Sequence, residues 1–225
     1  MRNINAKRIV VKIGTNVITN GDCTLNLSRM KKLIKQIAEM KDKGKDIMII
    51  TSGAIGAGMK ELQLNSRPRD VLMQQVCAAI GQSILMSDYQ SFFNKNGINV
   101  AQILLTYNDF SNKKTFNNLS NSLNKLLELG IVPIINENDP ISIDEIGPSF
   151  GDNDILSALI SRKMGVDLLI ILTDVDGLFN KNPNHKGATL ISEVRNIDKS
   201  TESIRGKANG LGLGGMKTKI KAAKI

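Results

Sequence analysis

Aromatic residues, histidine and cysteine are scarce in this chain. Its 225 residues include no tryptophan, and aromatic side chains make up 4% of the total. The one histidine, His185, lies in a turn-like segment, which argues against a histidine triad or a multi-histidine metal site; we predict no protein-held metal. Cys23 and Cys77 show no motif spacing, so we expect reduced thiols rather than a disulfide. Plentiful isoleucine and leucine predict an aliphatic core.

Long hydrophobic runs are also missing. The longest apolar runs are roughly five to seven residues, far below the ~20 that span a bilayer, and residues 1–5 lack the apolar region of a signal peptide. We therefore expect a soluble, cytoplasmic protein with no membrane partner. Hydrophobic residues nevertheless make up 41% of the chain, which is enough for the core of one large α/β domain.

The chain carries a net charge of +9, with a pI near 9.6. Much of the excess lies in residues 205–225, which contain five lysines, one arginine and no acidic residue. This segment lacks the interleaved aromatics on which single-strand binders stack bases, and no nucleic-acid motif is present. Nucleic-acid binding is therefore disfavoured, and lysines aimed at a polyphosphate explain part of the segment equally well.

Apolar strand patterns alternate with helical patterns along the chain. Because parallel strands need crossover connections, this alternation predicts an α/β fold with a mainly parallel sheet covered on both faces. The expected strands are residues 8–13, 46–51, 99–105, 131–135 and 167–172. The expected helices are residues 27–43, 70–93, 115–129 and one that begins near residue 154. In the second of these helices the predicted buried side contains Val71, Leu72, Val76, Ala79, Ile80 and Leu85.

Two clusters of Asn and acidic residues flank one loop in the middle of the chain. The first, residues 136–139 (Asn-Glu-Asn-Asp), follows an apolar strand, at the sheet end where open α/β folds bind ligands. The second, residues 151–154 (Gly-Asp-Asn-Asp), begins a helical pattern, with Asp152 or Asn153 as the predicted N-cap. The alternative is two ordinary capped turns, because Asn and Asp favour turns for local reasons.

Lys12 interrupts the first apolar strand, and Gly14 follows it. A lysine inside such a strand is costly unless its ammonium finds a partner, so we favour a lysine that faces a ligand. The alternative is an edge-strand lysine that reaches solvent. Residues 52–58 form a glycine-rich turn before a helix, which suits an anion. Their spacing, G-x-x-G-x-G, is not the dinucleotide fingerprint.

Polar groups also end the last strand, at Thr173 and Asp174. Residues 210–219 nearly match a Walker A loop. However, Met216 separates Gly215 from Lys217 and no apolar strand precedes the segment, so a Walker A loop is excluded. A glycine loop that leads into a lysine-bearing helix is compatible with nucleotide phosphates. The alternative is a disordered glycine hinge.

Taken in order, these motifs resemble the glutamate 5-kinase branch of the amino acid kinase family. The resemblance covers essentially the whole chain and is carried most specifically by residues 136–139, 151–154, 173–174 and 214–219. It implies a three-layer α/β/α sandwich with a mainly parallel central sheet. It also implies transfer of a phosphoryl group from ATP, with Mg²⁺, to the side-chain carboxylate of L-glutamate, in the first step of proline synthesis.

Site roles follow from the resemblance by matching position. Lys12 and Lys219 would embrace the transferring phosphoryl group, and Asp154 would hold both lysines. The remaining residues implied to line the phosphoryl and glutamate region are Gly14, Ser52, Gly53, Asn136, Asp139 and Asn153. Those implied to contact ATP, besides Lys12 and Gly14, are Thr173, Asp174, Leu213, Gly214, Gly215, Met216, Lys217, Thr218 and Lys219.

The resemblance further implies a homo-oligomer, dimer or tetramer, and inhibition by proline. We expect one kinase domain over residues 1–225, without a PUA domain, whose last elements could be missing because the chain stops inside a predicted helix. The connection over residues 140–150 is slightly longer than in many relatives. Three alternatives stay open: a family kinase for another carboxylate, carbamate or phosphate, a non-catalytic nucleotide-binding regulator, and a nucleic-acid binder.

Overall fold

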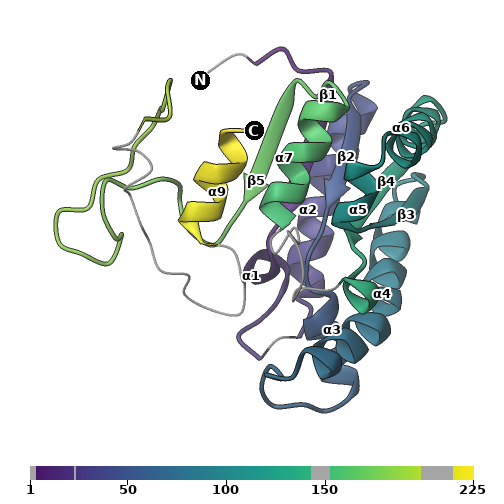
Figure 1. The fold of residues 1–225 in the computed structure, drawn as a ribbon, viewed down its shortest axis with the longest axis horizontal. Helices are drawn as coiled ribbons and strands as arrows, with labels where there is room; N and C mark the ends of the chain where they lie inside the picture. The colour runs from purple at the N-terminus through teal and green to yellow at the C-terminus, as the bar shows by residue number, and fades with distance from the viewer. Residues whose placement is uncertain (1–3, 23, 143–152, 199–214) are drawn as a thin grey trace.

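The protein was analysed as a computed structural model, which describes residues 4–22, 24–142, 153–198 and 215–225. Its described strands form one five-stranded sheet in the order β3-β4-β2-β1-β5 (Figure 1). Every pairing between these strands is parallel, as predicted. The strands are β1 (Arg8–Ile13), β2 (Asp46–Ile50), β3 (Val100–Leu105), β4 (Val132–Glu137) and β5 (Leu168–Leu172).

Helices connect the strands, and several begin at a side-chain cap. Asn26, Asp70 and Asn112 each accept a hydrogen bond from the backbone N–H three residues later, which satisfies a helix-end donor. The helical elements are α1 (Thr15–Ile18), α2 (Leu27–Asp42), α3 (Ala54–Glu61), α4 (Val71–Asn94), α5 (Tyr107–Ser111), α6 (Lys113–Glu128), the 3₁₀ turn η1 (Asp139–Ile141), α7 (Asn153–Lys163) and α9 (Met216–Ala223).

Helices cover both faces of the sheet, which confirms the three-layer α/β/α prediction (Figure 1). On one face, Val11 and Ile49 belong to a core shared with α2 and α4. On the other, Val10 and Ile50 belong to a core shared with α6 and α7. Parallel strands buried on both faces read as continuous apolar runs, which is why the strand positions were visible in the sequence.

β1 is an interior strand, paired with β2 on one side and β5 on the other. Lys12 therefore cannot reach solvent from a sheet edge, and that alternative is wrong. The residue is 4% exposed. A buried lysine at the carboxyl end of an interior strand needs a partner within the fold.

The predicted buried face of α4 is largely wrong. Val71, Leu72 and Val76 are 43%, 67% and 39% exposed, and Ala79 is exposed as well. Ile80 is half-buried, and Leu85 is the one predicted residue that is fully buried. Because α4 is apolar on nearly all sides, spacing alone could not show which face meets the sheet. The buried face instead contains Cys77, Ala78, Gly81, Gln82, Leu85, Tyr89 and Phe93.

α3 and α4 meet backbone to backbone at two glycines. A Cβ on Gly81 would lie 1.8 Å from the carbonyl oxygen of Ala54, and a Cβ on Gly58 would lie 1.9 Å from that of Cys77. No side chain fits at either position. This contact fixes the start of α3, and with it the turn that connects β2 to α3.

The structure describes only some of the residues on which the other predictions rest. Cys77 is a buried free thiol, as expected, whereas Cys23 lies outside the described residues. Asp152 and most of the 140–150 connection also lie outside them. β4 extends to Glu137, so Asn136 and Glu137 end the strand rather than follow it. Among the helices that the structure describes, none has the length and apolar character needed to cross a membrane.

Candidate functional site

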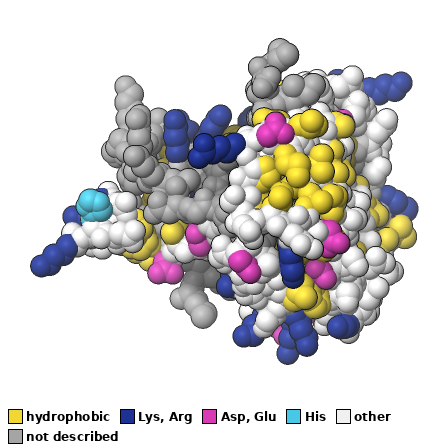
Figure 2. All heavy atoms as spheres, turned by 90° about the horizontal axis from the view of Figure 1, so that it is seen from below, with side chains coloured by type: hydrophobic (Ala, Val, Ile, Leu, Met, Phe, Trp, Pro, Cys, Tyr) yellow, Lys and Arg dark blue, Asp and Glu magenta, His cyan; other side chains and the backbone are white. Residues whose placement is uncertain are grey.

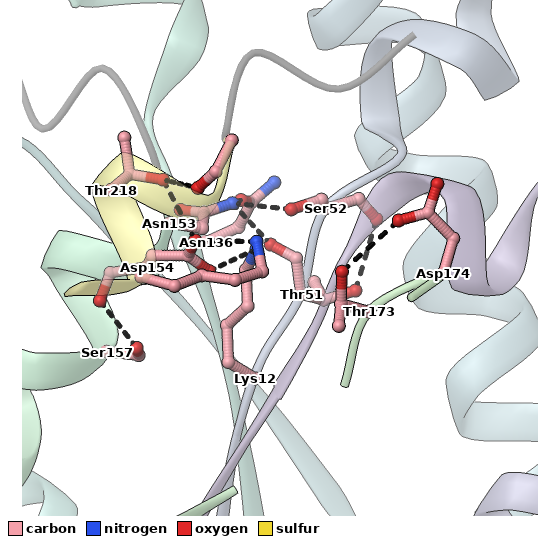
Figure 3. Close-up of polar contacts among 12 residues, drawn as sticks. Lys12, Thr51, Ser52, Asn136, Asn153, Asp154, Ser157, Thr173, Asp174 and Thr218 are labelled. Atoms are coloured by element: carbon pink, nitrogen blue, oxygen red, sulfur yellow. Dashed lines mark hydrogen bonds and ion pairs between the residues drawn. The ribbon is translucent and has the colours of Figure 1, made fainter. Parts of the chain in front are cut away.

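Two lysines from opposite ends of the chain share the carboxylate of Asp154 at the carboxyl end of the sheet. Figure 3 shows Lys12 beside Asp154. The Nζ of Lys12, on β1, lies 2.6 Å from Oδ1 of Asp154, near the start of α7. The Nζ of Lys219, on α9, lies 3.0 Å from Oδ2 of the same residue. The structure thus brings together the three residues predicted to be catalytic, and α9 can deliver Lys219 because it packs beside α7 (Figure 1).

Asp154 is ionised in this setting. Its side chain has no exposed surface, and those of Lys12 and Lys219 are 6% and 16% exposed. Burial by itself raises the pKa of Asp154, but the two lysines outweigh burial and lower the pKa below its ordinary value. The cluster therefore holds two cations around one anion, with a net positive charge beside the strand ends.

Thr218 is a further partner of Asp154. Its hydroxyl donates to Oδ2 at 3.1 Å and lies 2.8 Å from the carbonyl oxygen of Gly215. Thr218 is one of the predicted ATP contacts, and its hydroxyl also positions the carboxylate that holds the lysines. Gly215 is the N-cap of α9, so Thr218 also ties the start of that helix to the cluster.

We expect the contribution of Asp154 to stability to disappear only in strong acid. Because its folded-state pKa is lowered, the contribution is present above the unfolded-state pKa, about 4, and is lost as pH falls through the folded-state value. Urea unfolding of the wild type and of Asp154→Asn should therefore differ at neutral pH, and the gap should narrow only below about pH 4. A gap that closes between pH 7 and 5 would contradict this assignment.

An amide cluster lies next to the charged cluster and joins three elements. The Nδ2 of Asn153 donates to the carbonyl oxygen of Thr51 at 2.6 Å, to Oγ of Ser52 at 3.0 Å and to Oδ1 of Asn136 at 2.9 Å (Figure 3). Nδ2 of Asn136 donates to Oε1 of Gln82 at 2.9 Å. Three of the predicted substrate residues, Ser52, Asn136 and Asn153, are thereby in direct contact.

The two predicted glycines stand where the backbone approaches the cluster. A Cβ on Gly14 would lie 3.2 Å from the carbonyl oxygen of Leu172, which is a tight contact, and 3.8 Å from Nζ of Lys12, which is an ordinary one. Gly53 begins α3 with φ of 102°, a left-handed conformation that glycine adopts without strain. Gly53 therefore lets the chain turn sharply after Ser52.

Thr173 and Asp174 lie at the end of β5, where Asp174 is tied to the turn after β1. Its Oδ2 accepts a hydrogen bond of 2.8 Å from Nδ2 of Asn16, and its Oδ1 accepts one of 3.2 Å from Thr173. Arg29, on α2, donates to three backbone carbonyls of the same turn. Neither Asn16 nor Arg29 was predicted from the sequence. Asn16 meets Asp174 only because β1 and β5 are adjacent, whereas Arg29 acts through the turn that contains Asn16.

Asp139, in η1, lines a pocket of about 300 Å³ between α4 and the β3–β4 edge. Gln82 and Glu137 line the same pocket, as do Ala78, Ala79, Ser83, Gln102, Leu104 and Pro140. Gln82 was also missed from the sequence. A glutamine on the helix face that packs against the sheet was the available signal, but the wrong face of α4 had been chosen.

The remaining predicted nucleotide residues are only partly described. Met216 and Lys217 lie in the first turn of α9, and the Lys217 side chain is exposed. Leu213 and Gly214 lie outside the described residues. The structure therefore shows where the glycine loop ends but not its course.

The chain is similar to known proteins over nearly its whole length. Residues 7–225 match the model of the amino acid kinase family. Similar curated proteins named glutamate 5-kinase come from Methanococcoides burtonii (48% identity), Methanosarcina barkeri (47%) and Caldanaerobacter subterraneus (48%), with 97–98% of this chain aligned. The chain spans 59–60% of the length of these relatives. Since the family model covers nearly every residue, the chain belongs to the amino acid kinase family.

Proposed function

We propose that this protein transfers the γ-phosphoryl group of ATP to the side-chain carboxylate of L-glutamate, giving L-glutamyl 5-phosphate for proline synthesis. One observation carries the proposal: two buried ammonium groups converge on Asp154 beside a cluster of amides at the carboxyl ends of β1, β2 and β4. The names of the similar proteins support the choice of glutamate.

Phosphoryl transfer to a carboxylate requires stabilising positive charge rather than a general base. A carboxylate is already a nucleophile, so one of its oxygens attacks the γ-phosphorus as the bond to the β–γ bridging oxygen breaks, leaving ADP. The barrier is the approach of two anions, and preorganised cations reduce it by stabilising the charge of the transferring group. Lys12 and Lys219 would supply that charge, and Asp154 would hold them in place.

We propose that the substrates lie on opposite sides of this cluster. Glutamate would contact Ser52, Gly53, Asn136, Asp139 and Asn153, whose polar groups gather toward the α4 side. ATP would lie toward β5 and α9, near Gly14, Thr173, Asp174 and the loop from Leu213 to Lys219. Lys12, on β1 between β2 and β5, would then stand between the two substrates.

Mg²⁺ would arrive with the nucleotide. Magnesium prefers carboxylate and phosphate oxygens, yet both carboxylate oxygens of Asp154 already contact lysines. Among the residues that the structure describes, no group of three or more His, Cys, Asp or Glu side chains could hold a metal. The phosphates of ATP would therefore be the main ligands, and the metal would help neutralise their charge.

A substrate panel tests the proposal. ADP release should depend on L-glutamate and not on aspartate, N-acetylglutamate or carbamate. Preference for another acceptor would reveal a different kinase of the family, and nucleotide binding without turnover would reveal a regulator. Salt-dependent retention on RNA would instead favour nucleic-acid binding, since phosphate contacts release counterions.

Asp139→Ala should raise the KM for glutamate more than any other measured constant. Asp139 lines the pocket, and the carboxylate that pairs with the lysines is that of Asp154, so loss of Asp139 should weaken amino-acid binding without weakening phosphoryl transfer. We expect an increase of at least about tenfold, as for losing a charged hydrogen-bond partner, with kcat nearly unchanged. An unchanged KM for glutamate would refute the assignment.

We also propose a cytoplasmic homo-oligomer that proline inhibits. Figure 2 shows apolar side chains gathered on the lower face of the molecule. Val71, Leu72 and Val76 at the start of α4, together with Ile141, are large apolar residues that remain exposed, and such groups favour an interface between subunits. Light scattering that gives the mass of a monomer at micromolar concentration would exclude the oligomer.

Inhibition by proline is tested by measuring steady-state turnover while proline is titrated into the assay.

A further inference from the structure

Gln82 is a buried amide that the proposed function leaves without a role. It lies on α4, is 8% exposed, and its Oε1 accepts a hydrogen bond from Asn136. Its neighbours on the buried side of the helix include Ala78, Gly81 and Leu85. A polar side chain in such a position is costly unless it makes a required contact. The contact with Asn136 leads directly into the amide cluster.

A single backbone carbonyl fixes the orientation of three side-chain amides. The carbonyl oxygen of Thr51 can only accept, so Asn153 must turn Nδ2 toward it. The same Nδ2 also faces Asn136, which must therefore present Oδ1. Nδ2 of Asn136 then faces Gln82, which must present Oε1. Turning any one of these amides over would place two donors, or two acceptors, face to face.

The orientation of the Asn153 amide determines which of its polar atoms is left for a ligand. With Nδ2 of Asn153 engaged, its remaining polar atom is Oδ1, which is buried and lacks a hydrogen-bond partner in the described part of the chain. A carbonyl oxygen attracts an ammonium group, whereas an NH₂ in its place would repel one. The order of donors and acceptors along the three amides therefore favours a substrate whose hydrogen-bond donor contacts Oδ1 of Asn153.

We propose that Gln82 is a positioning residue that holds Asn136, and through it Asn153, so that the site presents an acceptor oxygen to the ammonium group of the amino-acid substrate. The inference rests on the proposed function, which places glutamate at these asparagines. α4 holds the other end of the chain as well, because the hydroxyl of Tyr89 lies 2.8 Å from that of Thr51. One helix thus supports both ends of the amide chain.

Two substitutions at Gln82 distinguish the role of its hydrogen-bond acceptor from the role of its size. Gln82→Met keeps similar length but removes the acceptor, which leaves Nδ2 of Asn136 buried without a partner. We expect it to raise the KM for glutamate about tenfold while kcat and the KM for ATP stay within about threefold. Gln82→Glu keeps an acceptor oxygen facing Asn136 and should restore most of the affinity. Wild-type KM in Gln82→Met, or equal loss in both variants, would overturn the proposal.

Ser87→Ala is the matched control. Ser87 lies on α4 five residues after Gln82, its side chain is exposed, and it is not among the residues that line the pocket. This variant should match the wild type. A double-mutant cycle adds a second test, since Gln82→Met should have no further effect on the KM for glutamate once Asn136→Ala has removed the residue through which it acts. Additive effects would mean that Gln82 acts by another route.

A measurement without substrate separates this inference from the proposed function. If the wild-type chain shows no glutamate-dependent turnover, the proposed function fails, but the amide chain can still be examined by NMR. The side-chain NH₂ protons of Asn136 should exchange with water faster in Gln82→Met than in the wild type or in Ser87→Ala. Equal exchange rates in all three proteins would show that Gln82 does not hold Asn136.

Discussion

Lys12→Ala and Lys219→Ala are each expected to lower kcat by at least ~10²-fold, the usual loss for one preorganised electrostatic group. Each ammonium contacts Asp154 and is largely shielded from water. In the proposed reaction both would stabilise charge on the transferring phosphoryl group, and neither could replace the other because they approach from different strands and helices. Glutamate-dependent ADP release, measured at saturating substrates, gives the effect on kcat directly.

Lys221→Ala is the control for charge on the same helix. Lys221 lies on α9 two residues after Lys219, but its side chain is exposed. Removing it changes the net charge of the chain by the same amount and should leave kcat unaltered. Thermal melting of all three variants would show whether they remain folded. A folded Lys12→Ala or Lys219→Ala protein with wild-type turnover would show that the lysine has no part in the reaction.

Gly81→Ala should destabilise the protein by roughly 3 kcal/mol, at the upper end of the usual cost of overpacking. The new Cβ would lie 1.8 Å from the carbonyl oxygen of Ala54 and 2.4 Å from the backbone nitrogen of Gly58, so two helices would have to separate. Neither neighbour is a side chain that could move aside. Urea unfolding measures the change, and the midpoint should fall without a large change in slope.

The same substitution should also disturb the site, because α3 begins directly after Ser52 and Gly53. Gly21→Ala is the matched control, since a Cβ on Gly21 would meet no atom within 4 Å. It should leave stability within about 0.5 kcal/mol of the wild type. If Gly81→Ala were as stable as Gly21→Ala, the close packing of α3 against α4 would be wrong.

Local spacing was enough to predict the five strands and the longer helices, but not the short elements α1, α5 and η1. β1, β2, β4 and β5 are short apolar runs followed by polar residues, and the helices between them require a parallel sheet. Lys12 stood out because a lysine in an apolar strand demands a partner. The acidic and amide clusters stood out because they occur where a strand ends and where a helix begins. These signals depend only on residues close together in the chain.

Contacts between distant segments required the tertiary structure. The buried face of α4 could not be chosen from the sequence, because an apolar helix gives no periodic signal until a sheet lies against it. That error hid Gln82, whose partner Asn136 lies 54 residues away. The contact of Thr218 with Asp154 was likewise not predicted, because α9 must pack beside α7 before the two side chains meet.

The sequence by itself therefore determined the order of strands and helices, the parallel sheet and the residues with unusual chemistry. The tertiary structure alone decided which of those residues touch, because β1, α7 and α9 must pack together before two lysines can share one carboxylate. The tertiary structure also determined how the three side-chain amides are oriented, because Asn153, on α7, donates to the carbonyl oxygen of Thr51 at the end of β2. Hydrogen bonds between elements far apart in the chain leave no periodic trace in the sequence.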